Sequence, residues 1–373
     1  MSKTFYSPDR LITGDAPYVG VLHLPSQTWD RPAIRLFFPA TLSDPNVTPK
    51  KADYYIYRIR VRYVLEGLVH STVVPHDTYI FRFIIRPIIW MIMLLLPAHY
   101  LPHTALVTDD STVQYLPPSA LKLNKVGKTK QRLVIFSHGL AATGEENSIF
   151  CTALAKKGYV VATQKYCEQV QFRANEFLDA CDWLLNLSSD KNISDGVIQL
   201  KNHPVLKEIC NNLDGRNVIA SGSSYGAATS VLAATKRPDQ FQCALLLDGW
   251  FNLGNASDDD NIHFPPDAYI SSGAKVGFGI PSLFIVSAGF KAWTDCYDAT
   301  CQLANQIPGN RYEMHVLPNT RHCNILDIVF FVPKWILKKY PEYFGVGMAD
   351  GVEVHEMIIT WTCQFLDKFF HDN

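Results

Sequence analysis

The stretch that decides the fold is NVIASGSSYGAATSVLAA, residues 217–234. It opens with a short apolar run rich in β-branched residues, continues through two glycines that flank Ser224, and ends in small residues that favour a helix. A serine in a G-x-S-x-G turn between strand and helix is typical of a nucleophile elbow. Glycine is expected at both positions for a steric reason: the strained turn brings the helix so close to the strand that larger side chains would clash. The motif therefore predicts an accessible Ser224 hydroxyl at the end of a strand.

The bare G-x-S-x-G pattern is weak evidence. With Gly and Ser each at about 7% of residues, a chain of this length yields roughly 0.1 matches by chance. The alternative interpretation is a Gly- and Ser-rich surface turn without function. The strand before Ser224 and the helix after it favour the elbow.

The rest of the chain repeats this alternation of short apolar runs and helix-length amphipathic segments. We expect six buried strands at 132–137, 159–163, 217–221, 243–248, 282–287 and 312–317, and helices at 148–157, 169–187, 227–236 and 355–370. Runs that are apolar throughout indicate strands buried on both faces, as in a parallel sheet covered by helices on both sides. Residues 18–24 and 33–38 are predicted as an antiparallel pair at the sheet edge. We predict one α/β domain over residues 1–373.

Composition narrows the function classes. The chain has 373 residues, of which 47% are hydrophobic and 18% charged, and this is typical of a folded globule. Its formal net charge of −1 lacks the basic footprint of nucleic-acid binding, so we expect no nucleic-acid partner. The nine cysteines show no metal-ligand spacing, and we predict neither a metal site nor a cofactor. The N-terminus shows no apolar signal region, which favours the cytoplasm.

A serine nucleophile needs a base and an orienting carboxylate, in the chain order Ser, Asp, His. Asp248 ends the strand after the elbow, at the edge of the sheet where ligands of such folds bind. Asp295 and Asp298, after the strand 282–287, are the competitors, and spacing alone favours Asp248 only slightly. For the base, His322 follows the last strand in the loop LPNTRHCN.

Three other histidines have structural interpretations. His315 lies within a strand pattern, His355 opens a helix, and His138 is expected to shape its loop by a hydrogen bond. An oxyanion hole requires two backbone N–H donors. One is expected from Tyr225, directly after the nucleophile, and the other from Leu140, in the loop that leaves the strand 132–137.

One segment departs from the α/β pattern. Residues 79–97 read YIFRFIIRPIIWMIMLLLP, and positions 88–96 contain no polar residue. The arginines and prolines leave it shorter than the 18 to 20 residues that span a bilayer. The segment, about 79–101 with its flank, is therefore either a core helix or a helix that lies in a membrane interface.

Together these motifs resemble those of a known enzyme family. The pieces VIFSHGLAA, QFRANEFLDACDWLL, ASGSSYGAATS, LLLDGW and NTRHCNILDIVFF resemble the plasma and intracellular type II platelet-activating factor acetylhydrolases, in order along the chain. The resemblance implies an α/β-hydrolase fold, with Ser224 as nucleophile, Asp248 and His322 completing the triad, and Leu140 and Tyr225 N–H groups as the oxyanion hole. Because that family takes its acid after the strand that follows the nucleophile, the resemblance favours Asp248 over Asp295.

The resemblance also gives the apolar segments a role. It implies a face that docks on a membrane or lipoprotein, formed by Trp90, Met91, Leu94 and Leu95 and by Trp335, Ile336 and Leu337. The elbow departs from the family pattern, with G-S-S-Y-G-A in place of G-H-S-F-G-G, and Ala141 stands where glycine is common. These changes leave the acyl pocket, and hence the chain length of the substrate, open.

The expected function is hydrolysis of the sn-2 ester of phospholipids with short or oxidised acyl chains, through an acyl-enzyme and without calcium. We expect a phospholipid substrate and a cytoplasmic, peripherally membrane-associated enzyme, with secretion left open. The rival interpretations are another serine carboxylesterase or sn-1 phospholipase, and an inactive lipid-binding scaffold. The intact Ser224, Asp248 and His322 speak against the scaffold.

Overall fold

The structure of the chain is a computed structural model. It describes residues 6, 9–24, 34–44, 46, 50–51, 114–115, 121–125, 130–140, 146–164, 170–186, 204–252 and 278–371. The apolar segment predicted at 79–101, with Trp90, Met91, Leu94 and Leu95, lies outside the described residues. No helix within these ranges is both long and apolar enough to cross a bilayer.

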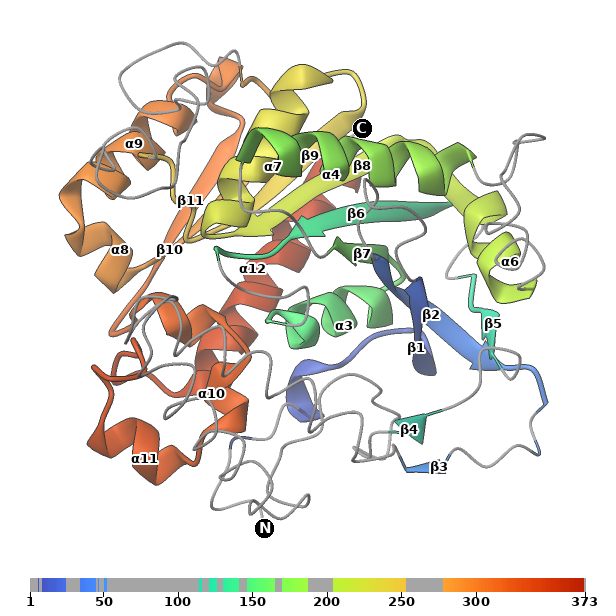
Figure 1. The fold of residues 1–373 in the computed structure, drawn as a ribbon, viewed down its shortest axis with the longest axis horizontal. Coiled ribbons are helices and arrows are strands. Elements are labelled where there is room, and N and C mark those ends of the chain that lie inside the picture. The colour runs from blue at the N-terminus through green and yellow to red at the C-terminus, as the bar shows by residue number, and fades with distance from the viewer. Residues whose placement is uncertain are drawn as a thin grey trace, which may run out of the picture.

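A central sheet of nine strands organises the described part of the molecule (Figure 1). Its strands are β1 (Tyr18–Leu24), β2 (Ile34–Leu42), β5 (Leu121–Leu123), β6 (Gln131–Ser137), β7 (Val160–Gln164), β8 (Leu213–Ser223), β9 (Phe241–Leu247), β10 (Ser282–Ser287) and β11 (Tyr312–Leu317). A separate two-stranded ribbon pairs β3 (Lys50–Lys51) with β4 (Gln114–Tyr115). The main order is β1-β2-β7-β6-β8-β9-β10-β11, and β5 pairs with β2.

The sheet is mostly parallel, as the sequence predicts. From β7 to β11 every neighbouring pair is parallel, whereas β2 pairs antiparallel with β1, β5 and β7. The antiparallel pair therefore lies at one edge of the sheet, as expected. Parallel order brings the carboxyl ends of β6, β8, β9, β10 and β11 to one rim, where side chains from distant parts of the sequence can meet.

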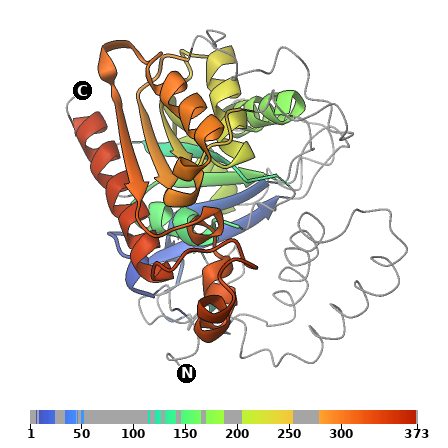
Figure 2. The same ribbon diagram turned by 90° about the vertical axis from the view of Figure 1, so that its left-hand side faces the viewer.

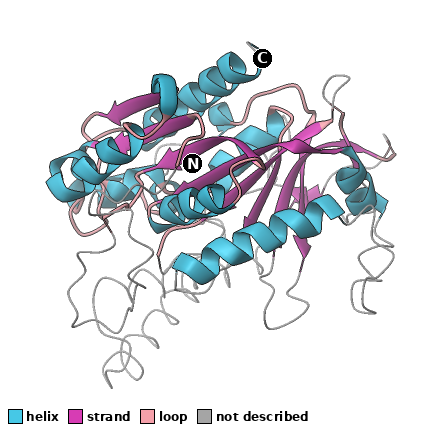
Figure 3. Ribbon diagram, turned by 90° about the horizontal axis from the view of Figure 1, so that it is seen from above, coloured by secondary structure: helices cyan, strands magenta, loops and turns pink. Residues whose placement is uncertain are grey.

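Helices cover both faces of the sheet (Figure 3). One face carries α4 (Val170–Asn186), α6 (Pro204–Asn212), α7 (Tyr225–Lys236) and α9 (Thr294–Ala304). The other face carries η1 (Asp9–Leu11), α3 (Ser148–Lys156), α10 (Ile328–Phe331), α11 (Lys334–Lys339) and α12 (Gly351–His371). The short elements α8 (Ala288–Ala292), η7 (Pro308–Asn310) and η8 (His322–Ile325) connect the last strands and helices. Figure 2 shows α12 running along one side of the sheet.

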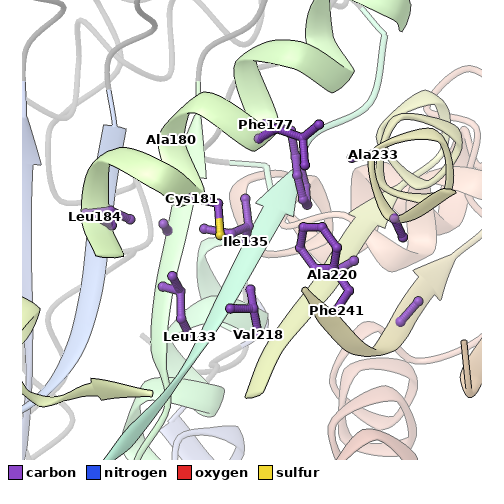
Figure 4. Packing of buried hydrophobic residues seen from close by; sticks show 14 of the residues in the cluster. Leu133, Ile135, Phe177, Ala180, Cys181, Leu184, Val218, Ala220, Ala233 and Phe241 are labelled. Carbon is purple, nitrogen blue, oxygen red and sulfur yellow. The ribbon is translucent and has the colours of Figure 1, made fainter. Parts of the chain in front are cut away.

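Alternation along the strands divides the core into two layers. Leu133 and Ile135 of β6 pack toward α4, and Val134 and Phe136 pack toward α3 and α12. Figure 4 shows the first layer, in which Phe177 of α4 lies over the sheet strands. Burial of these apolar side chains on both faces is the main stabilising contribution and fixes where each strand ends.

The boundaries differ from expectation at three places that matter for the site. Strand β8 begins at Leu213, four residues earlier than predicted, and α7 begins at Tyr225 rather than Ala227. Asp248 lies one residue beyond β9 instead of within it. Helices α6 and α9 were not predicted, because short amphipathic segments between strands resemble polar connections. His322 begins the 3₁₀ turn η8, which the sequence analysis treated as a loop.

Candidate active site

Ser224 occupies a strained turn between β8 and α7. Its backbone angles, φ 55° and ψ −123°, lie in a region that residues other than glycine rarely adopt. The turn is held by its neighbours, since Ser224 N–H donates to Leu247 O at 2.8 Å and Ser224 O accepts from Trp250 N–H at 3.1 Å. The strain is therefore maintained by packing against β9. This geometry is that of a nucleophile elbow.

The two glycines of the motif are needed for space. A Cβ atom on Gly222 would collide with the backbone of Gly226, and a Cβ atom on Gly226 would collide with the Ser137 and His138 carbonyl oxygens. The first contact explains how α7 turns back so tightly on β8. The second shows that the start of α7 packs directly on the loop that leaves β6.

Asp248 lies beside Ser224 at the next strand end. Ser223 pairs with Leu247 in the parallel register of β8 and β9, so the residues that follow them lie at the same level of the rim. Asp248 is completely buried and has φ 44°, and its backbone N–H donates to Ile285 O at 2.7 Å. Its Oδ1 atom accepts from the Ser287 N–H at 2.5 Å. These contacts fix the carboxylate and leave Oδ2 for another partner.

That partner is His322. Its Nδ1 atom lies 3.0 Å from Asp248 Oδ2, although the two residues are 74 positions apart. Because a carboxylate only accepts, Nδ1 is the atom that donates, and in the neutral imidazole Nε2 is then the nitrogen with a free lone pair. The ring also stacks on Phe290 of α8, with centroids 4.5 Å apart and planes 18° from parallel. The imidazole is thus held by a hydrogen bond and by a stacking contact.

A buried amide holds the backbone around His322. Asn324 is 1% exposed, and its Oδ1 atom accepts hydrogen bonds from the Arg321 and Gly347 N–H groups, at 2.8 and 2.5 Å. Thr320, two residues before His322, binds the start of α8, where its Oγ1 accepts from the Ala288 N–H at 3.2 Å. The loop that carries His322 is therefore anchored both to α8 and to the segment before α12.

The competing residues lie elsewhere. Asp295 and Asp298 are exposed on α9, and the structure brings Asp248 rather than either of them to His322. His315 lies in β11 and stacks on Trp361 of α12, with ring centroids 4.6 Å apart. His355 is enclosed beside Phe330, and burial lowers its pKa to about 4. His138 Nδ1 lies 2.7 Å from Gly139 O, in agreement with a loop-shaping hydrogen bond.

The two expected oxyanion donors lie on either side of the elbow. Tyr225 is the first residue of α7, and N–H groups in the first turn of a helix have no intrahelical acceptor. Leu140 lies in the loop after β6, which contacts the start of α7 through Gly226. Developing negative charge near Ser224 would also meet the positive end of the α7 dipole.

An aromatic row borders the site. Tyr225 meets Trp250 with ring centroids 6.4 Å apart, Trp250 meets Trp293 at 5.9 Å, and Trp293 meets Phe290 at 5.6 Å. Phe290 then stacks on His322. The row thus runs from one oxyanion donor to the base. It offers apolar surface to an uncharged substrate group.

Several residues at the site were not predicted from the sequence. Arg173 and Glu146 contact the loop after β6, and Phe290 and Asn324 hold His322. One signal pointed to Arg173: it lies on the apolar face of the predicted helix, one turn before Phe177. Within the described ranges no group of three or more His, Cys, Asp or Glu side chains is arranged to hold a metal ion.

The residues expected at a membrane face divide into three groups. Trp335 is 60% exposed on α11 and Ile336 is half-buried. Leu337 is buried in the core on the α12 side of the sheet, because the turn of α11 points it inward, so the expectation that it contacts lipid is wrong. The remaining four residues belong to the segment that the structure does not describe.

Comparison with known proteins agrees with this geometry. A family model described as "Platelet-activating factor acetylhydrolase, isoform II" matches residues 117–167 and 164–373. Among solved structures, the chain is similar to a ferulic acid esterase from Streptomyces cinnamoneus, with a TM-score of 0.52 and 15% identity, covering 95% of this chain and 90% of that one. At this identity the structural likeness supports the fold alone, and it agrees with the α/β-hydrolase class expected from the sequence.

The family match begins at residue 117, ahead of β5, and runs through the C-terminal helix α12, so it includes Ser224, Asp248 and His322. It covers more than half of the chain. The protein therefore belongs to the platelet-activating factor acetylhydrolase isoform II family, and the activity that this family supports is carboxylic ester hydrolysis.

Proposed function

We propose that the protein hydrolyses the sn-2 acyl ester of phospholipids with short or oxidised acyl chains, by a serine mechanism that does not require calcium. The observation that carries the proposal is the hydrogen bond between Asp248 Oδ2 and His322 Nδ1, at the rim where Ser224 occupies a strained elbow. A fully buried carboxylate hydrogen-bonded to a half-buried imidazole, at the same sheet rim as such a serine, supports a triad that activates a hydroxyl for acyl transfer.

The first half-reaction forms an acyl-enzyme. His322 Nε2 takes the proton of the Ser224 hydroxyl while Oγ attacks the ester carbonyl, and the carbonyl oxygen gains a negative charge. The Leu140 and Tyr225 N–H groups donate to that oxygen. As the tetrahedral intermediate collapses, the bond to the leaving alkoxide breaks and His322 returns the proton to it. The lysophospholipid leaves, and the acyl group remains on Ser224.

The second half-reaction repeats the same steps with water. His322 removes a proton from water, the resulting hydroxide attacks the acyl carbon, and Ser224 Oγ leaves with the proton that His322 returns. The carboxylic acid is released. Asp248 keeps its charge throughout and stabilises the imidazolium that forms in each half. The base, the nucleophile and the oxyanion donors all come from the chain, and this supports a reaction that proceeds without calcium.

The substrate class is supported by the family description and by the aromatic row beside Ser224. Trp250 and Trp293, whose ring centroids lie 5.9 Å apart, provide apolar contact for an acyl chain. A substrate panel that changes only the sn-2 chain tests the assignment. Acetyl and oxidised short chains should be cleaved at least ten times faster than palmitoyl, with release of the sn-2 acid. Release of the sn-1 acid, or preference for the long chain, would favour the rival phospholipase.

The serine mechanism is tested by covalent labelling. A fluorophosphonate should label the parent protein stoichiometrically, and Ser224→Ala should abolish both labelling and turnover while the circular dichroism spectrum is unchanged. Ser223→Ala, one residue away, is the matched control and should keep the label on Ser224. Undiminished labelling of Ser224→Ala would overturn the assignment. Turnover of the parent protein should also persist in excess chelator.

We further propose that the enzyme docks peripherally on a lipid surface at the cytoplasmic side. Trp335 is 60% exposed on α11, and the same short helix carries Lys338 and Lys339 in its last turn, which suits headgroup contact around an inserted aromatic ring. Replacing Trp335 by Glu should lower binding to anionic phosphatidylcholine–phosphatidylserine vesicles, and adding Trp90→Glu and Leu94→Glu should lower it further. Phe172→Glu, an exposed aromatic on α4, is the control and should bind as the parent does. Unchanged binding of all the α11 and 79–101 variants would contradict the docking proposal.

A further inference from the structure

Arg173 is a charged side chain enclosed in the core. It belongs to α4, is 1% exposed, and shares the buried face of that helix with Phe177 and Cys181. An arginine is almost never buried this deeply unless its guanidinium has specific partners. The partners of Arg173 therefore indicate what the buried charge does.

Those partners are the two segments that carry the oxyanion donors. The Nη2 atom of Arg173 donates to the His138 carbonyl oxygen at 2.5 Å and to Ser137 Oγ at 3.4 Å, both at the end of β6. Its guanidinium carbon lies 4.9 Å from the centre of the Tyr225 ring, at the start of α7. One planar cation thus touches the loop before Leu140 and the side chain of the residue whose N–H is the second donor.

The carbonyl held by Arg173 belongs to a peptide group that is held at both ends. The His138 carbonyl and the Gly139 N–H are parts of the same peptide unit. Arg173 donates to the carbonyl oxygen, and the Glu146 carboxyl group accepts from the Gly139 N–H. Arg173 and Glu146 therefore hold the same peptide group from its two opposite edges. The backbone carbonyl of Glu146 also accepts from the Asp327 N–H at 2.7 Å, which ties Glu146 to the segment after His322.

The next peptide group is the one that contains the donor. Gly139 O accepts from His138 Nδ1 at 2.7 Å, on the side where Arg173 Nη2 lies 3.5 Å away. In a trans peptide the carbonyl and the following N–H point in opposite directions. Fixing Gly139 O toward His138 and Arg173 therefore directs the Leu140 N–H away from them.

We propose that Arg173 is the positioning residue of the oxyanion hole, aligning the Leu140 and Tyr225 N–H groups for the transition state. This inference rests on the proposed serine mechanism. It assigns Arg173 no contact with substrate, because the side chain is 1% exposed and its guanidinium is enclosed among protein groups. Its effect should therefore appear in the stabilisation of the oxyanion and not in the binding of the neutral ester.

The test compares Arg173→Gln with Arg173→Lys, using a soluble p-nitrophenyl ester. Loss of one oxyanion donor lowers kcat by about 100 to 1,000-fold. We therefore expect Arg173→Gln to lower kcat by roughly 100-fold, with KM within about twofold of the parent. Arg173→Lys keeps the charge but lacks the planar fork, and should recover part of the lost kcat. The control is Arg237→Gln. Arg237 binds Asp182, which lies on α4 as Arg173 does but is partly exposed, and its removal should keep the parent kcat.

A second measurement separates positioning from a merely structural role. A trifluoromethyl ketone forms a tetrahedral adduct whose oxygen occupies the oxyanion hole. Its Ki should rise across the Arg173 variants in proportion to the loss of kcat/KM, while the Ki of a non-reactive amide analogue of the ester stays within twofold. A folded variant with parent kcat and ketone Ki would overturn the proposal. So would a fall in kcat that leaves the ketone Ki unchanged.

Folding and mechanism are controlled separately. If circular dichroism shows that Arg173→Gln is unfolded, the kcat and the ketone Ki of Arg173→Lys decide the question, since lysine keeps a buried cation of similar length. If Ser224→Ala still turns over ester, the serine mechanism fails and the inference fails with it. If Ser224→Ala is inactive and both Arg173 variants behave as the parent, only the role of Arg173 is refuted.

Discussion

Asp248 and His322 meet at 3.0 Å across 74 residues of sequence, and each is held by a second partner on a different element. The Ser287 N–H fixes the other carboxylate oxygen, and Phe290 fixes the imidazole plane. Ser287 and Phe290 flank the junction of β10 and α8, so this junction positions the acid and the base together. The pair depends on backbone placement that no single residue provides.

Replacing Asp248 by Asn should remove most of the activity while preserving the fold. An amide at this position favours the wrong imidazole tautomer, and the loss in serine hydrolases is about 10⁴ in kcat. Ester turnover and the rate of fluorophosphonate labelling should fall together. Asp295→Asn is the matched control, since that carboxylate is exposed in the first turn of α9, and it should keep normal turnover. Near-normal activity of Asp248→Asn would mean that another acid orients His322.

A methyl group on Gly226 should damage the oxyanion hole. Its Cβ would collide with the Ser137 and His138 carbonyl oxygens, which are backbone atoms that cannot rotate away. We expect Gly226→Ala to lose about 1 to 3 kcal/mol of folding free energy and at least tenfold in kcat. Gly279→Ala is the control, because its nearest neighbour is Pro308 at an ordinary 3.6 Å. Urea unfolding and ester turnover of both variants check this, and parent-like values for Gly226→Ala would contradict the close packing.

Removing the amide of Asn324 should loosen the loop that carries His322. Asn324→Ala leaves the Arg321 and Gly347 N–H groups without their buried acceptor, and each such loss costs about 1 to 3 kcal/mol. Asn324→Asp keeps an acceptor oxygen and should lose much less. Urea unfolding measures the stability, and kcat should fall in the same order. Equal stability of the two variants would show that the side-chain oxygen does not hold the loop.

Much of the fold was predictable, because burial leaves a direct mark on the sequence. The strands β6 to β10 each contain a buried apolar run, as expected, whereas β11 at the end of the sheet order is mostly half-buried, contrary to the expectation. The order of motifs placed Ser224 directly after β8 and His322 in the segment after β11. The pairing of Asp248 with His322 was harder to predict. Asp295 also comes after a strand in the sequence, and only the structure shows that it lies exposed on α9 whereas Asp248 is buried against His322.

Arg173 shows why the supporting residues could not be predicted. Its position on an apolar helix face signals a buried charge, and that signal does not identify the partner. The partner carbonyl of His138 lies 35 residues earlier in the sequence, and their contact arises only because α4 packs over the end of β6. Leu337 illustrates the opposite error: three consecutive apolar residues suggested one exposed face, whereas the helix turns one of them into the core.

The buried His355 should contribute a loss of stability in mild acid. Burial lowers the pKa of its imidazole from 6.5 to about 4 in the folded state. Between these values the unfolded chain binds a proton that the folded protein does not, so the free energy of unfolding falls as the pH drops from about 6.5 to about 4. The loss from this group is up to about 3 kcal/mol. Burial raises the pKa of Glu146 to about 8, which acts in the opposite direction because a neutral folded carboxyl favours low pH.

The contribution of His355 is therefore measured as a difference between variants. Urea unfolding at pH 7 and pH 5 should show a smaller acid-side loss of stability in His355→Gln than in the parent, because the glutamine has no proton to gain. Thr362→Val, a buried substitution in the same helix α12 without a titratable group, should change stability by the same amount at both pH values. If His355→Gln loses as much stability in acid as the parent does, another group accounts for the pH dependence.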